Sequence, residues 1–171
     1  MNLKRPAVIL FGAGATRGGL ATNRIPPPVD ADFFDIAGHV RGHGTPNFAK
    51  SVLSNVWDLY QRTNGMGLEA YYRDVETRER IDRIAKGRYR PMDWQARRNN
   101  LEELIRRVLI HTTCDTTTTP HSPVISRLHQ QVLGKLKAGD TLLTFNYDTV
   151  IEEAFETADL WSPVDGYGPG V

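Results

Sequence analysis

The sequence predicts an α/β fold in which a Rossmann-like parallel sheet has helices on both faces and contains a helical insertion. Two apolar runs support this prediction: residues 7–11 near the beginning of the chain and residues 141–145 near its end. Each run stops abruptly at small or polar residues, as buried parallel strands do. Because the carboxyl ends of parallel strands meet at one edge of a sheet, we expect the two following loops to form a ligand site.

Composition places the chain among ordinary globular proteins. It has 171 residues, of which 40% are hydrophobic and 24% charged, and a net charge of +1. This length suits one domain over residues 1–171. The single cysteine, Cys114, excludes an internal disulfide and a cysteine-rich zinc site, so we expect no metal. No stretch reaches the roughly 20 apolar residues of a membrane span, and the start is not a signal peptide, so we expect a cytoplasmic protein without a membrane partner.

The middle of the chain predicts a helical insertion over about residues 48–137. Prolines and scattered glycines make regular structure unexpected over residues 24–47. An amphipathic helix should follow over residues 48–63, with Asn47 as its N-cap and Asn64-Gly65 at its end. A charged helix is expected over residues 68–86. The next helix should be capped at Asn99 or Asn100, with the apolar face Leu101, Leu104, Ile105, Val108 and Leu109.

Two more helices flank the second apolar run. Ser122-Pro123 has the form of a helix start, with serine as the N-cap and proline at the first helical position. Gly139 should close that helix in a left-handed conformation. After the run, Asp148 stands where the N-cap of a helix over residues 149–158 would be. The helix that starts at Ser122-Pro123 should bury a stripe formed by Ile125, Leu128, Val132 and Leu136.

A glycine turn, Gly12-Ala13-Gly14, follows the first predicted strand. Two glycines let the backbone approach a pyrophosphate, and the next helix directs its first N–H groups at it, although a purely structural turn also uses such glycines. The segment is not a P-loop, because no Gly-Lys-Ser/Thr follows. Arg17 occupies the place of the third glycine of a Rossmann fingerprint, although Gly12, Gly14 and Gly18 fit a looser pattern. The lack of a second strand with an acidic residue at its end argues against a hydride-transferring oxidoreductase.

Three segments together resemble the motifs of the sirtuin-like, NAD-consuming domains. They are Gly12-Ala13-Gly14-Ala15-Thr16, Asp32-Phe33-Phe34 after the proline run, and Thr144-Phe145-Asn146-Tyr147-Asp148 at the end of the second strand. The alternative for the second segment is a surface turn with a buried phenylalanine pair. The alternative for Asp148 is a helix cap alone.

The resemblance implies NAD as ligand and its hydrolysis to nicotinamide and ADP-ribose as the reaction. It assigns the pyrophosphate to Gly12, Ala13, Gly14, Ala15 and Thr16, and it places Asp32 and Phe33 over the ribose and nicotinamide. Breaking the nicotinamide–ribose bond develops oxocarbenium character, as in glycoside hydrolysis. An asparagine amide can orient ribose hydroxyls or water there, so Asn146 and Asp148 are the expected catalytic residues, with Asp148 supporting the amide.

The chain departs from protein-deacylating sirtuins because it lacks their four-cysteine zinc module. It is closer to the prokaryotic sirtuin-like domains of defence systems, which implies a role in anti-phage defence with an effector or sensor domain, or a homo-oligomer, as partner. The family's catalytic His-Gly segment does not occur before Val171, so we expect only the N-terminal part of the domain. The family's catalytic residue is a histidine. Among the histidines here the best substitute is His121, ahead of His39, His43, His111 and a partly exposed His129, and the simpler interpretation of each is a surface or capping role.

A second hypothesis is a non-catalytic module that senses NAD or ADP-ribose or docks a partner. Residues 73–107 contain 11 Arg or Lys against 7 Asp or Glu, which would suit a partner or nucleic-acid surface. The simpler interpretation is a solvated helical face with mixed ion pairs, and under it we expect no nucleic acid.

Overall fold

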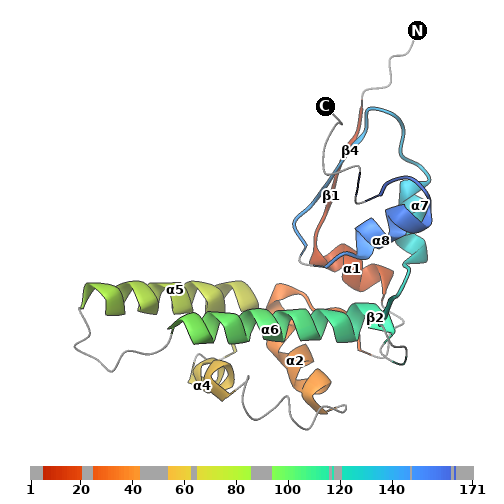
Figure 1. Ribbon diagram of the computed structural model, residues 1–171. Coiled ribbons are helices and arrows are strands. Elements are labelled where there is room, and N and C mark those ends of the chain that lie inside the picture. The colour runs from red at the N-terminus through yellow and green to blue at the C-terminus, as the bar shows by residue number, and fades with distance from the viewer. Residues whose placement is uncertain are drawn as a thin grey trace. The chain divides into compact units, whose positions relative to one another are not determined.

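The computed structural model describes residues 6–20, 25–42, 54–62, 65–85, 94–115, 117, 121–146, 148–162 and 164. These residues contain seven α-helices, one 3-10 helix and four short strands, so the fold is mixed α/β. The chain divides into two compact units (Figure 1), one formed by residues 1–27 with 112–171 and the other by residues 28–111. None of the described helices combines the length and the apolar character that crossing a membrane requires.

The two predicted strands exist and pair with each other. β1 (Val8–Phe11) and β4 (Thr141–Thr144) form a parallel sheet along their whole length (Figure 1). The pairing begins just before the strands, where the N–H of Ala7 donates to Asp140 Oδ1 at 2.7 Å and the N–H of Thr141 donates to the carbonyl of Ala7 at 2.8 Å. The described residues add no third strand to this sheet.

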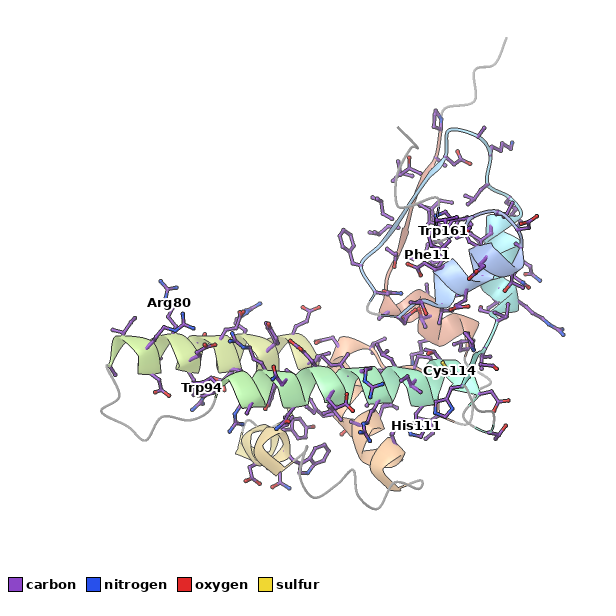
Figure 2. All side chains as sticks on the ribbon, in the orientation of Figure 1. Phe11, Arg80, Trp94, His111, Cys114 and Trp161 are labelled. Carbon is purple, nitrogen blue, oxygen red and sulfur yellow. The ribbon has the colours of Figure 1, made fainter. Side chains whose placement is uncertain are left out.

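The two faces of this sheet differ in exposure. Val8 and Leu10 are 69% and 64% exposed, and Leu143, the partner of Leu10, is 44% exposed. Phe11, labelled in Figure 2, is buried on the opposite face, where its ring lies 5.3 Å from that of His129. The expectation of helices on both faces is therefore met on one face only in the described part of the chain.

Three helices complete this unit. α1 (Ala13–Gly19) follows β1 directly, and α7 (Arg127–Leu133) packs against α8 (Val150–Thr157). α8 confirms the helix predicted over residues 149–158. Its buried side chains are Val150, Ile151 and Ala154.

The predicted start of α7 is wrong. Ser122–Pro123 forms the short strand β3, antiparallel to β2 (Cys114–Asp115), and the helix begins five residues past Ser122, at Arg127. Ser126 is the N-cap, because its hydroxyl accepts the N–H of His129 at 3.3 Å. The buried face of this helix follows Ser126, His129 and Leu133, so Leu128 is 54% exposed instead of buried.

Gly139 has the predicted left-handed conformation, with φ of +93°. The helix itself ends earlier, at Leu133, with Gly134 as its C-cap. Gly139 therefore forms part of the turn that leads into β4 and does not close the helix.

The second unit, residues 28–111, is helical. The 3-10 helix η1 (Asp30–Asp32) leads into α2 (Phe33–Gly42), which corrects the expectation of irregular structure over residues 24–47. Pro26, Pro27 and Pro28 precede α2 and do not interrupt it, and its apolar face is buried. That face consists of Phe33, Phe34, Ile36, Ala37 and Val40.

The remaining helices of this unit are α4 (Ser54–Arg62), α5 (Leu68–Ile84) and α6 (Trp94–Thr113), whose last two residues belong to the first unit. α5 confirms the charged helix predicted over residues 68–86. Asn47, Asn64 and the first residues of the predicted helix over 48–63 lie outside the described residues. The compact unit spans residues 28–111, and residues 112–137 of the expected insertion are counted with the sheet.

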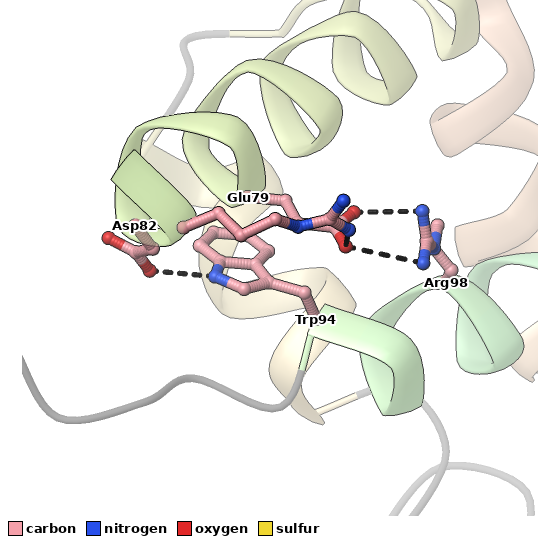
Figure 3. A network of polar contacts seen from close by, with 5 residues as sticks. Glu79, Asp82, Trp94 and Arg98 are labelled. Carbon is pink, nitrogen blue, oxygen red and sulfur yellow. Dashed lines mark hydrogen bonds and ion pairs between the residues drawn. The ribbon is translucent and has the colours of Figure 1, made fainter. Parts of the chain in front are cut away.

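α6 starts at Trp94, so Asn99 and Asn100 lie inside the helix and do not cap it. The first turns of α6 are held against α5 by polar contacts (Figure 3). The indole N–H of Trp94 donates to Asp82 Oδ2 at 2.7 Å, and Arg98 forms an ion pair with Glu79 at 2.8 Å. These contacts run in opposite directions along the two helices, so α5 and α6 are antiparallel.

The core of the second unit lies between α2, α4, α5 and α6. The phenol of Tyr71 is fully buried and donates to the carbonyl of Val56 at 3.2 Å. Burial raises the pKa of Tyr71 above its usual value, so the phenol is a neutral donor. The predicted apolar face of α6 is confirmed by three fully buried residues, Leu101, Leu104 and Val108.

We predict that Leu104→Ala lowers the free energy of unfolding by about 2–5 kcal/mol, because it opens a cavity in this core. Ile84→Ala on α5 is the matched control, since Ile84 is 73% exposed, and it should change stability by less than about 0.5 kcal/mol. Urea denaturation followed by tryptophan fluorescence measures both. Equal losses in the two variants would contradict the described core.

Candidate functional site

Three residues singled out in the sequence lie in direct contact at the end of the parallel sheet. The side-chain amide of Asn146 donates to Thr16 Oγ1 at 2.9 Å. The Thr16 hydroxyl lies 3.2 Å and 3.1 Å from the two carboxylate oxygens of Asp148. Residues that are 130 and 132 positions apart in the chain therefore form one hydrogen-bonded cluster, which we call the Thr16 cluster.

The parallel sheet is the reason that these residues meet. β1 and β4 end opposite each other, with Phe11 paired to Thr144, so both following loops leave at the same edge. Thr16 lies in the second turn of α1, which begins directly after β1. Asn146 follows β4 by two residues, and its backbone N–H donates to Thr144 Oγ1 at 3.2 Å.

Asp148 performs two tasks at once. Its Oδ1 accepts the backbone N–H of Val150 at 3.1 Å, so the carboxylate satisfies the start of α8 from the residue before the cap position, Thr149. The same carboxylate accepts the hydroxyl of Thr16. The predicted cap role is therefore present in modified form. The link between Asp148 and the amide of Asn146 runs through the hydroxyl of Thr16, a contact that the sequence did not predict.

The cluster has a defined donor and acceptor order. A hydroxyl has one proton, so Thr16 accepts from the amide of Asn146 and donates to Asp148. Thr16 is 2% exposed, whereas Asn146 and Asp148 are half-buried. No hydrogen bond among the described residues engages Asn146 Oδ1, and this acceptor remains available to a hydroxyl or a water molecule.

The glycine turn is open. Gly12 has φ of −122° and ψ of 176°, an extended backbone that any residue adopts. A Cβ atom built on Gly12 or Gly14 would meet no described atom within 4 Å. Neither the backbone nor the packing of the described residues therefore requires glycine at these positions. Close approach of a ligand to the backbone would require it.

Asp32 and Phe33 belong to the second unit, whereas the glycine turn belongs to the first. Asp32 Oδ1 accepts the N–H of Val29 at 2.8 Å, and Phe33 is 3% exposed with its ring edge-on to that of Phe34. A buried phenylalanine pair, the alternative considered for this segment, is thus present. The ligand contacts that the resemblance implies for Asp32 and Phe33 remain predictions.

Sequence reasoning missed a buried histidine beside the cluster. His129 is 3% exposed, which corrects the expectation of partial exposure. Its Nδ1 lies 2.7 Å from Ser126 Oγ. Burial lowers the pKa of His129, and the charge of Asp148 partly opposes this effect. Ser126 and His129 have the three-residue spacing of a capping box. This spacing was the signal in the sequence that could have located the helix start and the contact between the two residues.

The other histidines are less enclosed. His121 and His39 are exposed, and the ring of His39 contacts the carbonyl of Asp35 within α2 at 2.8 Å. His111 is half-buried near the end of α6, and His43 lies outside the described residues. No group of three or more metal-binding side chains occurs in the part of the chain that the structure describes.

The arginine-rich stretch has acidic partners on its own helices. Arg78 pairs with Asp74, and Arg83 and Arg98 pair with Glu79. On α6, Arg106 and Arg107 both bind Glu103 and lower its pKa to about 2. These pairs are the mixed ion pairs of the simpler interpretation, and a partner or nucleic-acid surface stays a prediction.

Comparison of the chain with models of protein families, with curated proteins and with solved structures found no match.

We predict that Thr16→Val destabilises the protein by about 1–3 kcal/mol, because Asn146 and Asp148 lose their common partner while the shape is kept. Thr16→Ser keeps the hydroxyl and should destabilise the protein less, by about the free energy of burying one methyl group. Urea denaturation of the two variants measures the difference. If Thr16→Ser is as destabilised as Thr16→Val, the hydroxyl does not form these bonds.

His129 should make stability depend on pH. Its unfolded pKa is about 6.5 and its folded pKa is lower, so the unfolded state binds more protons near pH 6. The contribution of His129 to the free energy of unfolding is fully present above about pH 6.5. It is lost as the pH falls towards the lowered pKa of the folded state. Urea denaturation at pH 7 and pH 5.5 should show this loss. It should be smaller in His129→Asn and unchanged in the control His121→Asn, and equal losses in all three proteins would contradict it.

Proposed function

We propose that this chain is a sirtuin-like, NAD-binding domain of Rossmann-like type whose reaction is the hydrolysis of NAD to nicotinamide and ADP-ribose. The observation that carries the proposal is the Thr16 cluster. Thr16, Asn146 and Asp148 come from two motifs that resemble those of one family, and they are hydrogen-bonded to one another. The parallel pairing of β1 and β4 supports the Rossmann-like assignment, since it brings both motifs to the carboxyl edge of a sheet.

The pyrophosphate of NAD is assigned to the turn over residues 12–16. Gly12 has no side chain to cap α1, and the first turn of α1 contains no acidic residue. The N–H of Ala15 donates to the carbonyl of Gly12 at 2.8 Å, so the N–H groups of Ala13 and Gly14 are the ones suited to an anion. The open space at Gly12 and Gly14 supports the same assignment, because a phosphate needs to approach the backbone closely.

The chemistry is assigned to Asn146 and Asp148. Loss of nicotinamide makes the ribose C1′ electron-poor, so the groups around it must orient a water molecule and tolerate positive charge. Asn146 Oδ1 can accept a hydrogen bond from a ribose hydroxyl or from that water. Thr16 holds the opposite end of the amide, and the carboxylate of Asp148 fixes the hydroxyl of Thr16. The ribose and nicotinamide contacts that the resemblance implies for Asp32 and Phe33 remain predictions, and the proposal does not depend on them.

The biological role that follows from this proposal is depletion of NAD in anti-phage defence. A module that only senses NAD or ADP-ribose is the other outcome. Calorimetric titration with NAD and ADP-ribose, combined with an assay of nicotinamide release, separates the two. Binding with release that Asn146→Ala abolishes supports the hydrolase, and binding of ADP-ribose without release identifies a sensor. Absence of binding by either nucleotide would contradict the proposed function.

Two glycines of α1 give a matched test of the phosphate assignment. Neither Gly14 nor Gly18 has a described atom within 4 Å of a built Cβ. Each change to alanine should therefore leave the fold intact and stabilise α1 by up to about 1 kcal/mol. Gly14→Ala should weaken NAD binding by about tenfold or more, because the methyl group occupies the phosphate approach. Gly18→Ala should bind as the unchanged protein does, and equal affinities of the two variants would contradict the assignment.

A further inference from the structure

A second polar cluster lies at the other end of α1, and we call it the His129 cluster. It consists of Gly19 at the end of α1, Ser126 at the N-cap of α7, and His129 one turn into α7. Ser126 and His129 are 1% and 3% exposed. Ser126 Oγ lies 3.2 Å from the carbonyl of Gly19 and 2.7 Å from Nδ1 of His129.

The hydrogen-bond order in this cluster determines the tautomer of the histidine. The carbonyl of Gly19 can only accept, so the single proton of the Ser126 hydroxyl is donated to it. Ser126 Oγ therefore accepts from the backbone N–H of His129 at 3.3 Å and from its Nδ1 at 2.7 Å. Nδ1 must carry a proton, and in the neutral ring the lone pair is on Nε2.

The close approach of α1 and α7 depends on this cluster. A Cβ built on Gly19 would lie 2.4 Å from Ser126 Oγ and 2.6 Å from His129 Nδ1, so the two helices meet only because residue 19 lacks a side chain. The same helix α1 carries Thr16 one turn earlier, and the N–H of Leu20 donates to the carbonyl of Thr16 at 3.0 Å. Displacement of the end of α1 would therefore move Thr16.

His129 also contacts the strand that precedes the glycine turn. Its ring lies 5.3 Å from that of Phe11, the last residue of β1, and is tilted by 31°. Asp148 is the charged group whose field acts on the ring. One buried side chain is thus linked to the end of β1, to the end of α1 and to the electrostatic environment of the Thr16 cluster.

We propose that His129 and Ser126 are positioning residues of the ligand site: by holding the end of α1, they place Thr16 against Asn146 and Asp148. This inference rests on the proposed function for the identity of the ligand, NAD or ADP-ribose. The direct consequence of this positioning is the geometry of the Thr16 cluster, which exists without ligand. Neither residue contacts the reacting atoms in this account.

The test uses three changes at these positions. His129→Leu removes the donor and keeps an apolar side chain, His129→Asn supplies an N–H near the position of Nδ1, and Gly19→Ala separates the two helices. We expect His129→Leu and Gly19→Ala to weaken ADP-ribose binding about tenfold, the size of one lost hydrogen bond. His129→Asn should restore most of the affinity. Gly18→Ala is the control, because a Cβ there meets no described atom within 4 Å.

A measurement without ligand distinguishes failure of this inference from failure of the proposed function. In the NMR spectrum of the folded protein, the side-chain amide of Asn146 should shift and exchange faster in His129→Leu, and it should return in His129→Asn. The imidazole nitrogen spectrum should show a proton on Nδ1. An unchanged Asn146 amide in folded His129→Leu, or a proton on Nε2 alone, overturns the inference. Absence of nucleotide binding by the unchanged protein overturns only the proposed function.

Discussion

The parallel pairing of β1 with β4 is the interaction on which the first unit depends. It joins segments from opposite ends of the chain and gives them a common direction, so the glycine turn and the loop after β4 leave at the same edge. Every contact of the Thr16 cluster crosses this edge. The pairing closes a loop that contains the second unit, and the cost of that closure grows only slowly with loop length. A helical unit over residues 28–111 is therefore compatible with a site built from the two ends.

A short helix carries much of this arrangement. α1 comprises 7 residues, including Gly14, Gly18 and Gly19, and a helix of this length and composition is not stable alone. Two polar clusters stabilise it instead, one at Thr16 and one at Gly19. Hydrogen bonds with defined donors and acceptors specify one position of the helix, whereas apolar contacts alone would permit several. The polar groups that align a ligand site can thus be the same groups that hold its supporting helix.

In the second unit, the sequence motif and the contacts of the same residues point to different roles. The segment Asp32-Phe33-Phe34 is the one interpreted as a family motif, and its contacts and those of the neighbouring Asp30 are the contacts of a folded helical unit. Asp30 Oδ1 accepts the N–H of Glu69 at the start of α5 at 2.7 Å, and Phe34 stacks on Tyr60 at 4.3 Å. In the arginine-rich stretch, five arginines of α5 and α6 form ion pairs with acidic residues of the same two helices, and Figure 3 shows one of these pairs, Arg98 with Glu79.

The sequence by itself determined the features that depend on local pattern. Apolar runs located both strands, helical spacing located α5, α8 and the buried face of α6, and the rule for parallel strands brought Thr16, Asn146 and Asp148 to one edge. Tertiary structure decided where α6 begins, because Asp82 of α5 supplies the partner of Trp94. It also favoured the start of α7, because the N-cap Ser126 donates to the carbonyl of Gly19, 107 residues away. It also decided that His129 is buried and that one face of the sheet is exposed. Caps and burial are set by neighbours distant in sequence or by the face a helix presents, and a local pattern contains neither.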